Sequence, residues 1–186
     1  MLATSALFFL FQHPEVLQKL KAEISTHIES SGSITAADIK ELKYAELVLK
    51  ETNRLEGPIC NILSRKATED MLVGDIPIRK GTGLNYMFRA NFFDPKYFEQ
   101  PFEFRPERMD ETRNKEAGMQ QIIDSAFSVG PKTCIGKHLA HIETKIMLVK
   151  FLERYSGMKE LQERVITLGT MAQYKHSDVE VTKATL

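Results

Sequence analysis

The chain has 186 residues, and its 25 basic residues balance its 25 acidic residues to leave a formal net charge of zero. A nucleic-acid-binding protein usually carries a strong basic excess, so this balance argues against nucleic acid as a partner. Hydrophobic residues make up 42% of the chain and charged residues 27%, proportions that exclude a disordered tail or a fibrous repeat. The two cysteines, Cys60 and Cys134, are too few for a secreted disulfide framework, so we expect an intracellular chain with reduced thiols.

An apolar run opens the sequence, from Met1 to Phe11. A membrane-spanning helix needs about 20 apolar residues, so we expect no membrane span here. The run also lacks the basic lead and the cleavage site of a signal peptide. Because it is apolar on every side at a period of 3.6 residues, it predicts a helix buried within a larger body, whose first turns we expect to be missing.

Helical spacing continues over the first third of the chain. Apolar residues recur every three to four positions over 14–30 and again over 42–55, where Gly57 ends the pattern. Between these two stretches, Thr35 followed by Asp38 resembles a helix start. We therefore expect the first third to be helical.

The pattern then changes to short β-prone segments separated by glycine and proline. We expect strands of a small antiparallel sheet at 62–68, 71–73, 76–79 and 83–87. An irregular stretch over 91–116 follows, and so long a loop is usually functional or packed on something large. The remaining chain predicts a long helix over about 135–155 and two last strands at 165–168 and 179–182. Together these elements indicate a mainly α protein with a small antiparallel β-sheet.

Cys134 stands just ahead of the long helix, in the segment Phe127-Ser-Val-Gly-Pro-Lys-Thr-Cys-Ile-Gly136. Backbone N–H groups and the positive end of the helix dipole favour a thiolate there. Gly130 and Gly136 let the backbone turn sharply and approach a flat partner closely, and Lys132 offers a cation nearby. An anionic sulfur on a tight loop suits a soft metal, although a lone cysteine at a helix start is more often a buried, inert residue.

The segment follows the pattern Phe-x-x-Gly-x-basic-x-Cys-x-Gly, and it resembles the haem-binding signature of the cytochrome P450 superfamily. The resemblance implies that Cys134 is the thiolate ligand of a haem iron and that Phe127 shields it. Gly130 and Gly136 would then frame the haem. Lys132 stands where most members have an arginine that contacts a haem propionate, and it would offer a point charge in place of a planar fork.

Two further motifs resemble the same family in the expected order. Glu51-Thr-Asn-Arg54 places an acid and a base on one helix face, which by itself is a common exposed pair worth about 0.2–0.5 kcal/mol. The segment 104–109, Phe-Arg-Pro-Glu-Arg-Met, resembles the family's Pro-Glu-Arg-Phe element. The resemblance implies that Arg108 joins Glu51 and Arg54 in a buried ion triad behind the haem, with Met109 in place of the usual aromatic residue.

Other segments fall into the same register, from Leu2 to about Thr182. Arg65 matches a position that often contacts a haem propionate, although a solvated strand arginine is an equally good interpretation. Four residues match a segment that lines the substrate pocket, and their mostly apolar character indicates an apolar substrate: Ile59, Cys60, Asn61 and Ile62. The resemblance implies that residues 1–186 are a single partial domain, the haem-proximal C-terminal part of the family's fold.

The family reaction is the insertion of one atom of dioxygen into an organic substrate, with electrons relayed from NAD(P)H through a reductase. The resemblance therefore implies haem as cofactor, and a reductase, dioxygen and an apolar organic molecule as partners. It implies an intracellular location, at the endoplasmic reticulum membrane for a full-length form. Counting back from His13, the acid–threonine pair that delivers protons to bound dioxygen would fall just before Met1. We therefore expect the isolated chain to bind haem weakly or not at all and to be inactive.

Interpretations from other classes remain open. A truncated, inactive haem-binding fragment shares every motif with the enzyme. Cys134, His138 and His141 fall at i, i+4 and i+7 and could share a helix face as a Cys/His metal site, although no fourth ligand stands out. The same side chains could also form a thiol nucleophile with its base.

Overall fold

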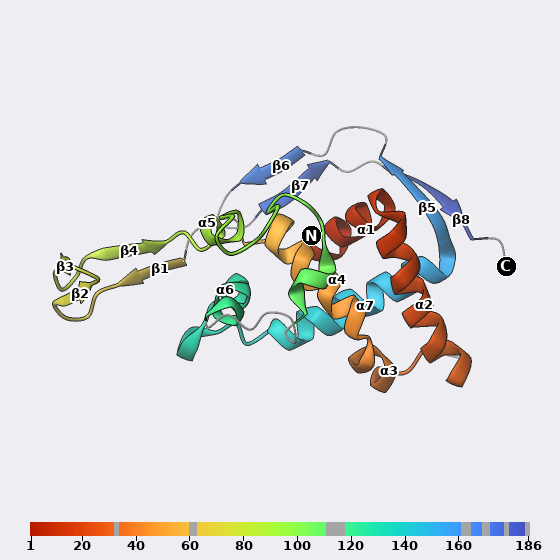
Figure 1. Ribbon diagram of the computed structural model, residues 1–186, viewed down its shortest axis with the longest axis horizontal. Coiled ribbons are helices and arrows are strands. Elements are labelled where there is room, and N and C mark those ends of the chain that lie inside the picture. Colours follow the sequence, from red (N-terminus) through yellow and green to blue (C-terminus); the bar gives the residue numbers. More distant parts are fainter. Residues whose placement is uncertain are drawn as a thin grey trace.

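The structure is a computed structural model that describes residues 1–31, 34–59, 63–110, 118–160, 165–168, 172–176 and 179–184. Within these residues helices form the body of the molecule, and pairs of antiparallel strands lie at its edges (Figure 1). The predicted class, mainly α with small antiparallel β-sheets, is confirmed.

Four longer helices build the body: α1 (Leu2–Gln12), α2 (Pro14–Ser31), α4 (Lys43–Glu56) and α7 (Lys137–Arg154). Helix α1 packs against the other three, which explains why its sequence is apolar on every side. The prediction of a buried helix there is confirmed, since no residue of α1 ahead of Gln12 is exposed. The short helix α3 (Ala36–Glu41) begins at Thr35, whose hydroxyl accepts from the Asp38 N–H while the Asp38 carboxylate accepts from the Thr35 N–H.

The hydrophobic core lies where these helices meet. Each helix contributes apolar side chains at spacings of three and four residues, so that one stripe of each faces the others. A fully buried leucine or valine adds roughly 1.5–3 kcal/mol relative to an exposed one, so this core supplies much of the stability. Its fully buried members include Leu10, Leu20, Leu42, Val48, Leu49, Leu148 and Val149.

The predicted first sheet is instead two separate ladders. Strand β1 (Leu63–Lys66) pairs with β4 (Gly83–Tyr86), and β2 (Met71–Val73) pairs with β3 (Ile76–Ile78). Together they form an arm that extends away from the helical body (Figure 1). Gly74, with φ of 63°, closes a two-residue turn that pairs β2 with β3 locally.

Among the described residues are short helices that the sequence did not predict, including α5 (Arg89–Phe92), η1 (Pro106–Met109) and α6 (Met119–Asp124). Helices of four to six residues show almost no period, and they form only when tertiary packing supports them. Here that packing is a second hydrophobic cluster, in which Phe92 and Met109 are fully buried.

Helix α7 ends at Arg154, and the chain continues directly into a strand that was not predicted, β5 (Tyr155–Glu160). Strand β5 pairs with β8 (Val179–Lys183), and β6 (Val165–Leu168) pairs with β7 (Ala172–His176), which was also not predicted. The predicted strands at 165–168 and 179–182 are confirmed. The two missed strands, β5 and β7, are the pairing partners of the two predicted ones. Which strands pair with each other cannot be seen from the apolar and polar alternation within one strand.

Candidate functional site

The Cys134 loop, residues 125–136, connects α6 to α7 through two short 3₁₀ turns, η2 (Ser125–Phe127) and η3 (Gly130–Lys132). Two residues reverse the chain with positive φ angles, Ser128 at 63° and Gly130 at 73°. The Cys134 N–H then donates to the carbonyl oxygen of Phe127 at 2.8 Å and closes the loop. Helix α7 starts directly after it, with Gly136 as its N-cap.

The loop presents its sulfur on an open face. Cys134 is exposed, and its neighbours Val129 and Ile135 are 46% and 102% exposed. Gly130 has open space where a Cβ would stand, and a Cβ on Gly136 would lie 3.9 Å from the Cys134 Sγ. The loop therefore offers an accessible sulfur, two apolar side chains and two positions without side chains at the start of an 18-residue helix.

The cations predicted near the loop occupy different settings. Arg65, on β1, donates from Nη2 to the Ser128 Oγ at 3.1 Å and so joins the strand arm to the loop. Lys132 lies on η3 and is exposed. Phe127 is half-buried and turns its ring toward α7, where the His141 ring meets it edge-to-face at 5.1 Å between centroids.

A buried ion cluster lies beneath the irregular stretch of the chain. The Glu51 carboxylate accepts from Nε and Nη2 of Arg54, both at 2.8 Å, and the Arg108 Nε lies 3.0 Å from its Oε1. The side chains of Glu51 and Arg54 are 0% and 1% exposed. The structure thus brings together the three residues that the sequence motifs single out.

Backbone groups complete this cluster, and no sequence signal pointed to them. Arg54 donates to the carbonyl oxygens of Phe92 at 2.7 Å and of Pro101 at 2.5 Å. The Arg105 N–H donates to the Glu51 Oε1 at 3.1 Å. The cluster therefore fixes the path of residues 92–105 through main-chain contacts, which any residue type could supply.

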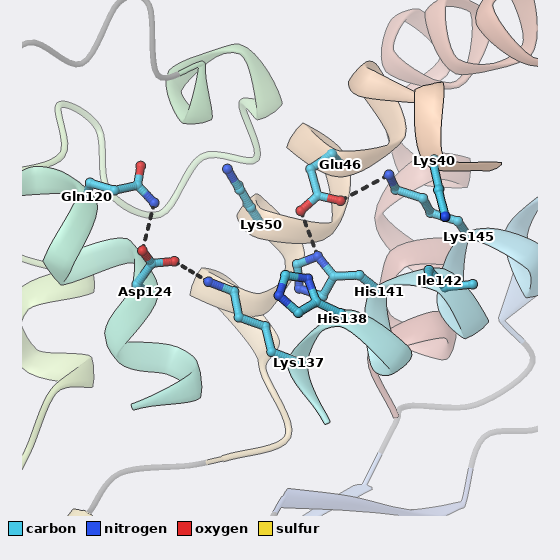
Figure 2. Close-up of a pocket in the computed structure, with 10 residues that line it drawn as sticks. All are labelled: Lys40, Glu46, Lys50, Gln120, Asp124, Lys137, His138, His141, Ile142 and Lys145. Atoms are coloured by element: carbon cyan, nitrogen blue, oxygen red, sulfur yellow. Dashed lines mark hydrogen bonds and ion pairs between the residues drawn. The ribbon is translucent and has the colours of Figure 1, made fainter. Parts of the chain in front are cut away.

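A second polar cluster, which sequence reasoning missed, centres on Glu46 of α4 (Figure 2). Its Oε1 lies 2.6 Å from the His141 Nδ1, and its Oε2 lies 3.1 Å from the Lys145 Nζ. Burial would raise the pKa of Glu46, but the hydrogen bonds and charges of His141 and Lys145 outweigh it and lower this pKa to about 2. The i, i+4 spacing of His141 and Lys145 was a signal that they share a helix face.

The cluster borders a cavity of about 540 Å³ between α4, α6 and α7. Asp124, on its α6 side, pairs with the Lys137 Nζ at 2.5 Å and accepts from the Gln120 amide at 3.0 Å. Figure 2 shows the residues that line the cavity: Lys40, Glu46, Lys50, Gln120, Asp124, Lys137, His138, His141, Ile142 and Lys145.

Comparison with known proteins decides the family. The family model for cytochrome P450 matches residues 3–173. The chain belongs to the cytochrome P450 family. The "Probable cytochrome P450 4d20" of Drosophila melanogaster is 36% identical over 152 residues, which cover 81% of this chain and 29% of that protein. "Cytochrome P450 3A5" of Homo sapiens is 33% identical over 162 residues, covering 87% and 31%.

Solved P450 structures share the fold. The haem domain of cytochrome P450DA superposes with a TM-score of 0.86 at 21% identity, over 99% of this chain and 41% of that chain. This P450 chain spans about 30% of the length of the two relatives named above. In the part of the chain that the structure describes, no helix is long and apolar enough to cross a membrane.

The residues of the Cys134 loop fit a haem group. A cysteine thiolate is one of the ligands that hold haem iron, and the Cys134 sulfur is accessible to such an iron. The exposed Val129 and Ile135 suit an apolar macrocycle, while the bare backbone at Gly130 permits close approach.

The Cys/His metal site considered from the sequence does not form. His141 is buried against Glu46 and Phe127, whereas His138 and Cys134 are exposed. Among the described residues, no group of three or more His, Cys, Asp or Glu side chains is placed to hold a metal ion. That interpretation is therefore wrong for this geometry.

Of the four residues expected to line the substrate pocket, the structure describes one. Ile59 is half-buried and packs against the second hydrophobic cluster. Cys60, Asn61 and Ile62 lie outside the described residues.

Proposed function

We propose that this chain is the haem-proximal part of a haem-thiolate monooxygenase and that Cys134 is the axial ligand of its iron. The accessible sulfur at the start of α7, within a P450 family chain, carries the proposal. When bound, the haem supplies oxygen activation, and a thiolate ligand favours cleavage of the O–O bond.

The neighbouring residues have separate roles in this proposal. Phe127 shields one side of the sulfur, and its carbonyl oxygen holds the Cys134 N–H. Gly130 and Gly136 let the backbone approach the macrocycle. Lys132 and Arg65 would supply the positive charges for its propionate groups. Arg65 already donates to the Ser128 Oγ, so its guanidinium lies beside the loop. There it would hold a propionate as well as the serine.

Glu51, Arg54 and Arg108 form the structural support of the site. Their cluster fixes the chain between α5 and η1, and Met109, the last residue of η1, is fully buried. Because a buried charge without its partner is costly, the cluster keeps this part of the chain in one conformation.

The reaction partners follow from the proposed class. The chain would receive electrons from NAD(P)H through a reductase, use dioxygen and act on an apolar organic molecule that Ile59, Cys60, Asn61 and Ile62 help to line. An intracellular location, at the endoplasmic reticulum membrane for a full-length form, belongs to the same proposal.

For the 186-residue chain by itself we propose weak haem binding and no turnover. Cys134 and Ile135 lie on an open face, so the described residues supply one wall of a haem pocket. Efficient oxygen chemistry needs a site from which water is excluded. A truncated, inactive haem-binding form is therefore the second candidate, and substrate oxidation by the purified chain would refute it.

The experiment is the reduced carbon monoxide difference spectrum of the chain expressed with added haem. We expect a thiolate-type Soret shift that Cys134→Ser abolishes and that Cys60→Ser, the matched control at the other cysteine, retains. A shift that survives in Cys134→Ser, or disappears only in Cys60→Ser, would refute the assignment of the ligand.

A further inference from the structure

His141 connects the Glu46 cluster to the Cys134 loop. It lies in the second turn of α7, and only 10% of its side chain is exposed. The His141 ring has a polar contact on one side, where its Nδ1 lies 2.6 Å from the Glu46 Oε1. The other contact is aromatic, since the His141 ring meets the Phe127 ring at 5.1 Å and an interplanar angle of 60°.

The loop depends on Phe127 at two points. Its carbonyl oxygen accepts from the Cys134 N–H at 2.8 Å, so the position of the Phe127 backbone determines that of the cysteine. The next residue, Ser128, has a φ of 63°, which is unfavourable for a residue with a Cβ. A loop with such a residue at its base requires support from neighbouring side chains.

The Glu46 cluster gives His141 a fixed place from which to provide that support. A buried imidazole needs a polar partner, and Glu46 supplies it from α4. Glu46 is held in turn by Lys145, one turn further along α7, so the carboxylate is bonded on both oxygens. Other charged groups that line this cavity come from four elements: Lys40 of α3, Lys50 of α4, Asp124 of α6 and Lys137 of α7.

We propose that His141 is a positioning residue for the Cys134 loop: held by Glu46, its ring keeps Phe127 in place, and Phe127 keeps the cysteine backbone in place. The role in haem binding rests on the function proposed above, whereas the mechanical role is a property of the chain without haem. His141 acts on the loop through Phe127.

Two substitutions separate the aromatic contact from everything else that His141 does. His141→Leu and His141→Phe both fill the buried space and remove the bond to Glu46, but only phenylalanine offers a ring to Phe127. An edge-to-face pair adds roughly 0.5–1.5 kcal/mol. By hydrogen exchange of the haem-free chain, followed by mass spectrometry, we expect His141→Leu to accelerate exchange in residues 127–136 roughly two- to tenfold relative to His141→Phe.

The exposed neighbour His138 provides the matched control, and His138→Leu should leave exchange in the loop unchanged. Peptides from α1 and α2 report global unfolding and should exchange alike in every variant. Equal loop exchange in His141→Leu and His141→Phe would overturn the proposal. So would the absence of a nuclear Overhauser effect between the rings of His141 and Phe127 in the unsubstituted chain, a measurement that does not depend on any variant folding.

With haem added, His141→Leu should lower the fraction of the reduced carbon monoxide complex that shows the thiolate-type Soret band, while His141→Phe should restore it. If no variant, including the unsubstituted chain, takes up haem, the haem binding proposed for the 186-residue chain by itself fails, while the exchange experiment still decides the role of His141. If haem binds and the exchange rates do not differ, the proposed function stands and the role of His141 is refuted.

Discussion

Substitution of Glu51 by glutamine removes the negative charge from a buried cluster that contains two arginines. The change keeps the shape of the side chain, so packing is almost unaltered. Glu51 is 0% exposed and Arg54 is 1% exposed by side chain, and two hydrogen bonds of 2.8 Å join them. Glutamine can accept only one of these bonds, and it leaves the Arg54 charge uncompensated.

Loss of one partner from a buried ion pair costs about 3–5 kcal/mol. Arg54 keeps its bonds to the carbonyl oxygens of Phe92 and Pro101, which stabilise its charge in part, so we expect the lower end of this range. A loss of about 3 kcal/mol changes the folding equilibrium roughly a hundredfold. It is a large fraction of the 5–15 kcal/mol that typically separates folded from unfolded domains.

Urea unfolding followed by circular dichroism measures the effect as a lower midpoint at unchanged slope. The chain offers a matched control in a second i, i+3 pair, Lys150 and Glu153, which are joined at 2.9 Å with side chains 63% and 33% exposed. Glu153→Gln should cost at most about 1 kcal/mol, because exposed pairs contribute little. If Glu51→Gln costs no more than Glu153→Gln, the reasoning from burial is wrong.

Three further predictions concern pH, backbone strain and the contact between arm and loop. The pKa of Glu46 is about 2 in the folded chain against 4.5 for the free group, so its stabilising contribution is present above about pH 4.5 and lost as pH falls toward 2. Acid titration of the unfolding free energy should therefore be flatter in Glu46→Gln. Gly130→Ala forces a φ of 73° on a residue with a Cβ and should cost about 1–2 kcal/mol in urea unfolding. A double-mutant cycle of Arg65→Ala and Ser128→Ala should give a coupling of about 0.5–1.5 kcal/mol.

Each of these predictions has a result that contradicts it. An equally steep acid titration in Glu46→Gln would place the titrating group elsewhere. Gly83→Ala, in strand β4, has open space for its Cβ and should not destabilise the chain, so an equal loss at Gly83 and Gly130 would exclude strain as the cause. Additive effects of Arg65→Ala and Ser128→Ala would show that their hydrogen bond contributes nothing.

Features that depend on nearby residues were predictable from the sequence. The apolar period of α2 and α4 reports which face of each helix meets the core, because 3.6 residues complete one turn, whereas α1 is apolar on every side and its sequence predicts burial all round. The Phe-x-x-Gly-x-basic-x-Cys-x-Gly segment indicated the haem-thiolate family before any contact was known, since the residue types that a thiolate loop needs lie within ten positions. The strands of the arm were recognisable from the turn residues between them.

Features that depend on residues far apart were decided by the tertiary structure. The short helices α5, η1 and α6 exist because Phe92 and Met109 are buried in a cluster that no local pattern describes. Glu46 and His141 are 95 positions apart, and neither is unusual in its own helix. Packing of the two helices brings them within 2.6 Å and pairs the buried imidazole with a half-buried carboxylate. The histidine that contacts the Phe127 ring is therefore one with a polar partner. The sequence by itself determined which residues the Cys134 loop contains, whereas the packing of α4 against α7 decided what supports it, because that support comes from contacts between helices distant in the chain.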